Sequence, residues 1–176
     1  MKHNILYSFR RCPYAIRARW ALLNTNQVVE LREVELKNKP IELIQISKKA
    51  TVPVLKTSLN KVIDESLEIM IWSIKRSNMH ELFGDKNNDI SKEILSLIEI
   101  NDNAFKYHLD RFKYAKRYQN SNEELHFTKA IKFIKKWNEL LAENKYFFGD
   151  TPTIADWSIW PFVRQFRIAC ESQKRT

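Results

Sequence analysis

The sequence has little glycine, few cysteines and no long apolar run. Two glycines in 176 residues argue against Gly-rich and turn-rich all-β architectures and favour helices. Two cysteines are too few for a disulfide scaffold, and so low a cysteine content is typical of a cytoplasmic protein. No run approaches the roughly 18 apolar residues of a membrane span, and the first residues lack the apolar core of a signal peptide. We therefore expect a helix-rich, cytoplasmic, globular protein that does not bind a membrane.

The charge is basic, with a formal net value of +9. Such a balance is compatible with a nucleic-acid or other acidic partner. The alternative is lysine spread over solvated helix faces, with no partner implied. The basic pairs at 48–49, 135–136 and 174–175 are scattered, and no nucleic-acid-binding signature surrounds them. We therefore do not expect nucleic acid as a partner, although the charge keeps that reading open.

The first 77 residues mix the two hydrophobic periods. Alternating or β-branched runs predict strands, and apolar residues spaced three and four apart predict helices. The strands are expected at 4–8, 28–36, 52–55 and 62–63, and the helices at 13–24, 40–46 and from 66 onward. Their order is β-α-β-α-β-β-α, a compact α/β domain over 1–77. The polar stretch 78–89 is typical of a linker.

Residues 90–176 carry only the helical period. Their spacing predicts one long helix over 94–112 and a second over 125–141, with a break at 120–122. Thr153 and Asp156 fit a capping box that opens a last helix. The predicted fold class is thus α/β plus all-α, with an all-helical C-terminal domain.

Cys12 stands directly after the first predicted strand and directly before the first predicted helix. Unpaired N–H groups and the positive end of the helix dipole favour a thiolate there, and Arg10 and Arg11 act in the same direction. Pro13 suits the first helical position, since its missing N–H costs nothing there. A cysteine so placed can have a pKa well below about 8.5 and be nucleophilic near neutrality. The alternative is a buried structural cysteine.

Position 15 is Ala, so the second thiol of a C-x-x-C dithiol is absent. Redox chemistry at Cys12 would therefore use one thiol and an external partner. Cys170 is expected to be a small apolar filler. The histidines are not spaced as a metal site, and no metal is expected.

Four short motifs follow one another along the chain: Cys12-Pro13-Tyr14-Ala15, Val52-Pro53, Glu65-Ser66 and Thr153-Ile154-Ala155-Asp156-Trp157. Together they resemble the glutathione transferase family over residues 4–170. The first motif and the stretch 36–40 look most like its cysteine-type, omega-like branch and the related bacterial thiol transferases. The resemblance implies a thioredoxin-like N-terminal domain and an all-helical domain that lacks the family's last helices.

The resemblance also implies roles for residues of the first domain. Cys12 would form a mixed disulfide with glutathione, with Tyr14 packed beside the tripeptide. The peptide bond before Pro53 would be cis, leaving the Val52 N–H and C=O free to pair with the cysteine backbone of glutathione. Lys39 would pair with the glycyl carboxylate.

The γ-glutamyl end of glutathione is assigned to the start of the helix that follows residue 65. Ser66, as N-cap, would meet the carboxylate, and Glu65 would accept from the ammonium. Tyr7 is the tyrosine that could mimic the thiolate-stabilising tyrosine of other classes, but we expect it in the sheet core. A second-substrate pocket is predicted from aromatic residues of the helical domain: Tyr107, Phe112, Tyr114, Trp160 and Phe166.

The expected function is a glutathione-dependent thiol transferase that reduces mixed disulfides through one cysteine. Glutathione is the expected cosubstrate, and a glutathionylated thiol or small electrophile is its partner. Two alternatives stay open: a conjugating transferase acting on hydrophobic electrophiles, and a non-catalytic binding or regulatory protein on the same fold. A homodimer is one possible assembly.

Overall fold

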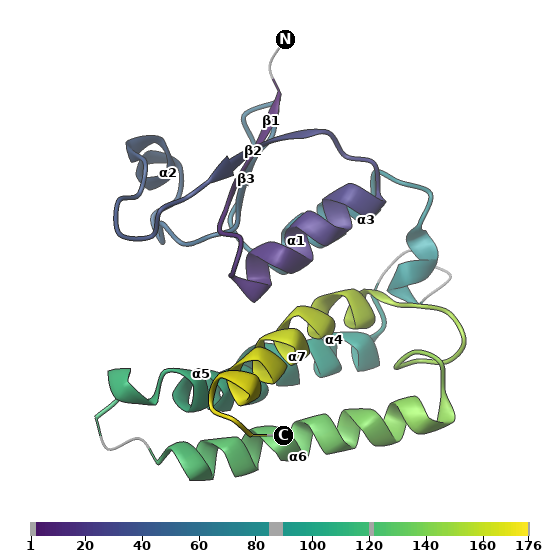
Figure 1. The fold of residues 1–176 in the computed structure, drawn as a ribbon. Coiled ribbons are helices and arrows are strands. Elements are labelled where there is room, and N and C mark those ends of the chain that lie inside the picture. Colours follow the sequence, from purple (N-terminus) through teal and green to yellow (C-terminus); the bar gives the residue numbers. More distant parts are fainter. Residues whose placement is uncertain (1–2, 85–89, 120–121, 176) are drawn as a thin grey trace. The chain divides into compact units, whose positions relative to one another are not determined.

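The protein is described by a computed structural model that covers residues 3–84, 90–119 and 122–175. The chain divides into two compact units, Met1–His80 and Glu81–Thr176 (Figure 1). The first holds the sheet and the second is helical, which confirms the predicted fold class. Within the described residues, no helix is both long and apolar enough to cross a membrane.

The sheet of the first unit has four strands in the order β2-β1-β3-β4. These are β1 (Asn4–Ser8), β2 (Val29–Glu33), β3 (Val54–Lys56) and β4 (Val62–Ile63). β1 pairs in parallel with β2, whereas β3 runs antiparallel to both β1 and β4. This mixed sheet, with its helices, is the expected thioredoxin-like arrangement.

Three helices cover the sheet: α1 (Pro13–Asn24), α2 (Ile41–Ile46) and α3 (Ser66–Ile74). Successive residues of β1 point to opposite faces, so Leu6 and Tyr7 enter different cores. Leu6 packs with residues of α1 and α3, including Ala18 and Ile69. Tyr7 packs with Leu43 of α2 and is 2% exposed. The expectation that Tyr7 faces the sheet core is confirmed.

The second strand is shorter than the predicted span 28–36. Among the described residues, β2 lies at the edge of the sheet and pairs with β1 alone, residue for residue from Asn4↔Val29 to Ser8↔Glu33. Its length is therefore set by β1. Val28 and Leu36, which the pattern places in the strand, are 80% and 46% exposed.

The second unit contains α4 (Lys92–Ile100), α5 (Lys106–Lys113), α6 (Glu123–Glu143) and α7 (Ile154–Ser172). Single turns of 3-10 helix cover His80–Phe83 and Ala115–Arg117. The core is aromatic: Phe105 contacts Trp137 edge to face at 4.8 Å. Asn120 and Ser121, which belong to the break predicted at 120–122, lie outside the described residues. Residues 85–89 of the predicted linker also lie outside them.

The helix predicted over 94–112 is interrupted. A π-helical segment, Asn101–Phe105, separates α4 from α5. A π segment inserts one residue into the helical ladder, and Asn101 at its start is fully buried. The spacing of apolar residues by three and four gives no sign of such an insertion.

The start of α7 confirms the predicted capping box. The Thr153 N–H donates to Asp156 Oδ2 at 2.7 Å, and the Thr153 side chain receives the reciprocal bond from the backbone of Asp156. Asp156 Oδ1 also accepts from the Phe147 N–H at 3.0 Å. One carboxylate therefore ties the preceding loop to the helix.

Candidate functional site

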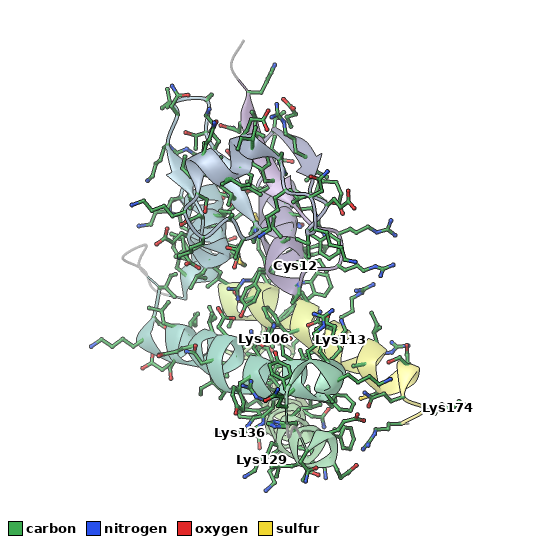
Figure 2. The ribbon with its side chains drawn as sticks, turned by 90° about the vertical axis from the view of Figure 1, so that its left-hand side faces the viewer. Cys12, Lys106, Lys113, Lys129, Lys136 and Lys174 are labelled. Carbon is green, nitrogen blue, oxygen red and sulfur yellow. The ribbon has the colours of Figure 1, made fainter. Side chains whose placement is uncertain are left out.

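Cys12 is the N-cap residue of α1, immediately before Pro13 at the first helical position. Figure 2 labels it where the first helix begins. Its backbone is extended, with φ −79° and ψ 121°, and its N–H donates to the Phe9 carbonyl at 3.1 Å. The side chain is half-buried. The sulfur is thus held at the positive end of a helix with partial access to solvent, an environment that favours ionisation.

The structure brings the loop before β3 to the sulfur. The Val52–Pro53 peptide bond is cis. The Cys12 thiol donates a weak hydrogen bond to the Val52 carbonyl oxygen, with 3.7 Å between the two atoms. The Val52 carbonyl was expected to be free, so this contact is a correction. Residues 40 positions apart in the sequence therefore meet at one point.

The start of α3 differs from the prediction by one residue. Glu65, not Ser66, is the N-cap, with an extended backbone at φ −110° and ψ 129°. Ser66 is the first helical residue and is buried, and its hydroxyl accepts a hydrogen bond from Arg17 Nε at 3.0 Å. Because the hydroxyl is oriented by Arg17, it serves α1–α3 packing as well as the helix start.

Glu65 is exposed and forms an ion pair with Lys49. The carboxylate raises the pKa of Lys49, chiefly through their hydrogen bond. Glu65 therefore already binds an ammonium group, that of Lys49. An ammonium is the kind of cation that this carboxylate was predicted to bind. Lys49 was not identified from the sequence.

Tyr14 lies in the first turn of α1 with Arg17 one turn later, its guanidinium carbon 5.0 Å from the Tyr14 ring centroid. Lys39 lies between β2 and α2 and is half-buried. Within the part of the chain that the structure describes, no hydrogen bond or ion pair links Lys39 to Cys12, Val52 or Glu65. In the structure, Cys12 thus contacts Val52, and Arg17 contacts both Tyr14 and Ser66. Lys39 is not bonded to Cys12, Val52 or Glu65 among the described residues.

Phe112, one of the five aromatic residues predicted to line a second pocket, is a core residue. It is fully buried and packs against Phe127 and Phe166 at centroid distances of 5.2 and 5.6 Å. Its position at the interior of α5, under α6 and α7, explains the difference. Tyr107 is 48% exposed and carries the Arg111 guanidinium over its ring at 3.5 Å.

Tyr114 ends α5, where Lys113 and Arg117 lie over its ring at 4.9 and 4.2 Å. Trp160 lies on α7 and is half-buried. A cavity of about 430 Å³ opens between α6 and α7, with Phe166 and Cys170 in its lining. Of the five predicted residues, Phe166 lines it and the other four do not.

The two cysteines differ in environment. Burial raises the pKa of the Cys170 thiol, which keeps it protonated near neutrality. Cys170 was expected to be an apolar filler, but it is half-buried and lines the cavity between α6 and α7. Cys12 is the thiol placed at a helix start.

Comparison with known families decides the relationship of the chain. A family model described as the glutathione S-transferase N-terminal domain matches residues 6–78, and one described as the C-terminal domain matches residues 107–174. The chain belongs to the glutathione transferase family. The two matches span most of the chain, and the cysteine-type branch is consistent with them. A comparison with curated protein sequences finds no match.

Solved structures share the fold at low identity. An Omega 3C glutathione transferase from Trametes versicolor is 18% identical with a TM-score of 0.83, covering 100% of this chain and 78% of its own. A family member from Pseudomonas fluorescens, solved with two glutathione bound, is 15% identical with a TM-score of 0.82, covering 98% and 81%. A Tau class enzyme from mango, Mangifera indica, is 19% identical with a TM-score of 0.79, covering 99% and 81%.

Two arginines of α1, Arg17 and Arg19, were not identified from the sequence as residues of the site. Arg17 is 2% exposed, although arginine is rarely buried. Its spacing from Tyr14 and Ala21, three and four residues, places it on the helix face that packs inward. Arg19 is half-buried and bonds to the segment before Cys12. The helical spacing indicates that Arg17 faces inward. It does not indicate the partner Ser66, which is 49 residues away in the sequence.

Proposed function

We propose that the protein is a glutathione-dependent thiol transferase with Cys12 as its reacting thiol. The observation that supports this proposal is the position of the Cys12 sulfur at the start of α1, 3.7 Å from the Val52 carbonyl oxygen and beside Pro53. Ala15 stands where a dithiol enzyme would have its second cysteine. The Pseudomonas fluorescens relative, solved with two glutathione bound, supports glutathione as the cosubstrate.

The chemistry needs only one thiol of the protein. The Cys12 thiolate attacks the glutathione sulfur of a mixed disulfide; a Cys12–glutathione disulfide forms, and the substrate leaves as a thiolate that takes up a proton. The thiolate of a second glutathione then attacks the same glutathione sulfur. Oxidised glutathione is released and the Cys12 thiolate is regenerated, so electrons balance without a further reductant.

Ionisation of Cys12 would also prepare the binding site. The thiol proton bonds to the Val52 carbonyl in the structure. Once that proton has left, the carbonyl oxygen can accept from the cysteine N–H of glutathione. Tyr14 and Pro53 are the neighbouring side chains on which we propose that the tripeptide packs.

We assign the charged ends of glutathione to separate groups. Ser66, oriented by Arg17 at the positive end of α3, would bind the γ-glutamyl carboxylate. Glu65 would exchange its Lys49 partner for the glutathione ammonium. Lys39 would pair with the glycyl carboxylate. These roles need no metal.

The test compares the wild-type protein with Cys12→Ser and, as the matched control, Cys170→Ser. We expect the wild-type and C170S proteins to reduce a glutathionylated peptide with glutathione, and C12S to lose that activity. Thiol transfer that survives in C12S would overturn the proposal. Conjugation of chloronitrobenzene in C12S, without thiol transfer in the wild type, would instead support a conjugating enzyme. No binding at millimolar glutathione would indicate a non-catalytic protein.

A further inference from the structure

Arg19 contacts three residues of the segment that leads into Cys12. It lies on α1 seven residues after Cys12, hence on the same helix face, and helical side chains lean toward the N-terminus. Its Nη1 donates to the Ser8 hydroxyl and to the Phe9 carbonyl at 3.3 Å, and its Nη2 donates to the Arg10 carbonyl at 3.2 Å. One guanidinium thus holds three consecutive residues.

That segment supports Cys12 directly. The Phe9 carbonyl accepts both from Arg19 and from the Cys12 N–H, at 3.1 Å for the latter. The end of β2 also holds the segment, because the Arg10 N–H donates to Glu33 Oε1 at 2.9 Å. Arg19 and Cys12 therefore share one carbonyl acceptor, in a turn that Glu33 also holds.

The charge of Arg19 also acts on Cys12. Burial lowers the pKa of Arg19, while the charges of Glu33 and Cys12 raise it. An arginine stays protonated in spite of such burial. Because Coulomb interaction is mutual, a thiolate that stabilises this guanidinium is stabilised by it to the same extent.

We propose that Arg19 is the positioning residue for Cys12: its guanidinium fixes the Ser8–Arg10 segment and places a positive charge beside the thiolate. This rests on the proposed function in one respect, that Cys12 is the reacting thiol. The assignment replaces the sequence-based expectation that Arg10 and Arg11 supply the charge. Both side chains are exposed, and Arg10 takes part through its backbone.

The test measures the pH dependence of Cys12 alkylation by iodoacetamide in a Cys170→Ser background, which leaves one thiol. The variants are Arg19→Gln, Arg19→Lys and Arg11→Gln, with the exposed Arg76→Gln as the control. We expect R19Q to raise the alkylation pKa by about one unit, since an opposite charge nearby shifts a pKa by about 1–3 units. R19K keeps the charge but lacks the forked donor, so its pKa should lie between those of R19Q and the wild type.

An unchanged alkylation pKa in R19Q overturns the proposal, as does a rise in R11Q without one in R19Q. If R19Q does not fold, R19K decides: a wild-type pKa in R19K overturns the positioning role. The assay contains no glutathione. Failure of the proposal for Arg19 is therefore distinguishable from failure of the proposed function. The latter would appear as a C12S protein that still transfers thiols.

Discussion

Arg17 Nε donates a hydrogen bond to Ser66 Oγ at 3.0 Å across the interface of α1 and α3, and both residues are almost fully buried. Hydrogen bonds to charged groups contribute about 1.5–3 kcal/mol. We expect Arg17→Met to lower the free energy of unfolding by about that amount and to weaken glutathione binding, since Ser66 loses its orienting donor. Urea unfolding and calorimetric titration measure the two effects.

The control for this variant is Arg167→Met, because the Arg167–Glu171 pair is exposed and such pairs contribute little. Neither stability nor glutathione affinity should change in R167M. An R17M protein with wild-type affinity for glutathione would contradict the role given to Ser66.

Glu65 is expected to recognise the ammonium of glutathione through its carboxylate. Glu65→Gln keeps the shape of the side chain and removes its charge, so glutathione affinity should fall about tenfold. The affinity for deaminoglutathione, which lacks that ammonium, should be the same in E65Q and the wild type. An equal loss for both ligands would show that Glu65 does not contact the ammonium.

The His108 and His126 rings meet between α5 and α6, with 2.8 Å between their Nδ1 atoms. Burial lowers the pKa of both; for His108 the charges of His126, Lys129 and Arg111 add to this effect, and for His126 that of Arg111. The unfolded chain, with histidines near the ordinary pKa of 6.5, then binds more protons than the folded one. Stability should therefore fall as the pH drops below about 6.5.

Urea unfolding between about pH 7 and pH 5 tests the histidine pair. The double variant His108→Gln, His126→Gln should lose stability less steeply as the pH falls than the wild type does. The exposed His3→Gln serves as the control and should follow the wild type. A double variant with the wild-type pH slope would contradict the prediction.

Asp156 joins α7 to the loop before it, as an acceptor for both Thr153 and the Phe147 N–H. Loss of a cap costs about 0.5–2 kcal/mol. We expect Asp156→Ala to destabilise the protein more than Thr153→Ala, because it also leaves the Phe147 N–H without its acceptor. Asp150→Ala, in the same loop region and exposed, should have little effect in thermal unfolding. Equal losses for D156A and T153A would contradict the second role of Asp156.

Local sequence signals predicted most of the architecture because they act over a few residues. Pro13 at the first helical position gave the start of α1, and the Thr153–Asp156 spacing gave the start of α7. The end of β2 was missed, since it depends on how far β1 extends beside it. The π segment at Asn101 was missed because apolar spacing does not reveal one inserted residue.

For the candidate site, the position of Cys12 followed from the sequence, but the side chains that surround it did not. Arg17 and Ser66, Arg19 and Ser8, and Cys12 and Val52 meet only after the chain has folded back. A charged residue in a sequence is expected to be exposed, so nothing distinguished Arg19 from Arg10 or Arg11. The N-cap shifted from Ser66 to Glu65 for a similar reason, since the Ser66 hydroxyl has a distant partner.

The central claim is that Cys12 reacts with glutathione as a single nucleophilic thiol. Mass spectrometry of the wild-type protein after incubation with oxidised glutathione tests this most directly, with peptide mapping to locate the adduct. The account predicts one glutathione per chain, attached to Cys12 and removed by excess reduced glutathione. An adduct found only on Cys170, or no adduct at all, would contradict it.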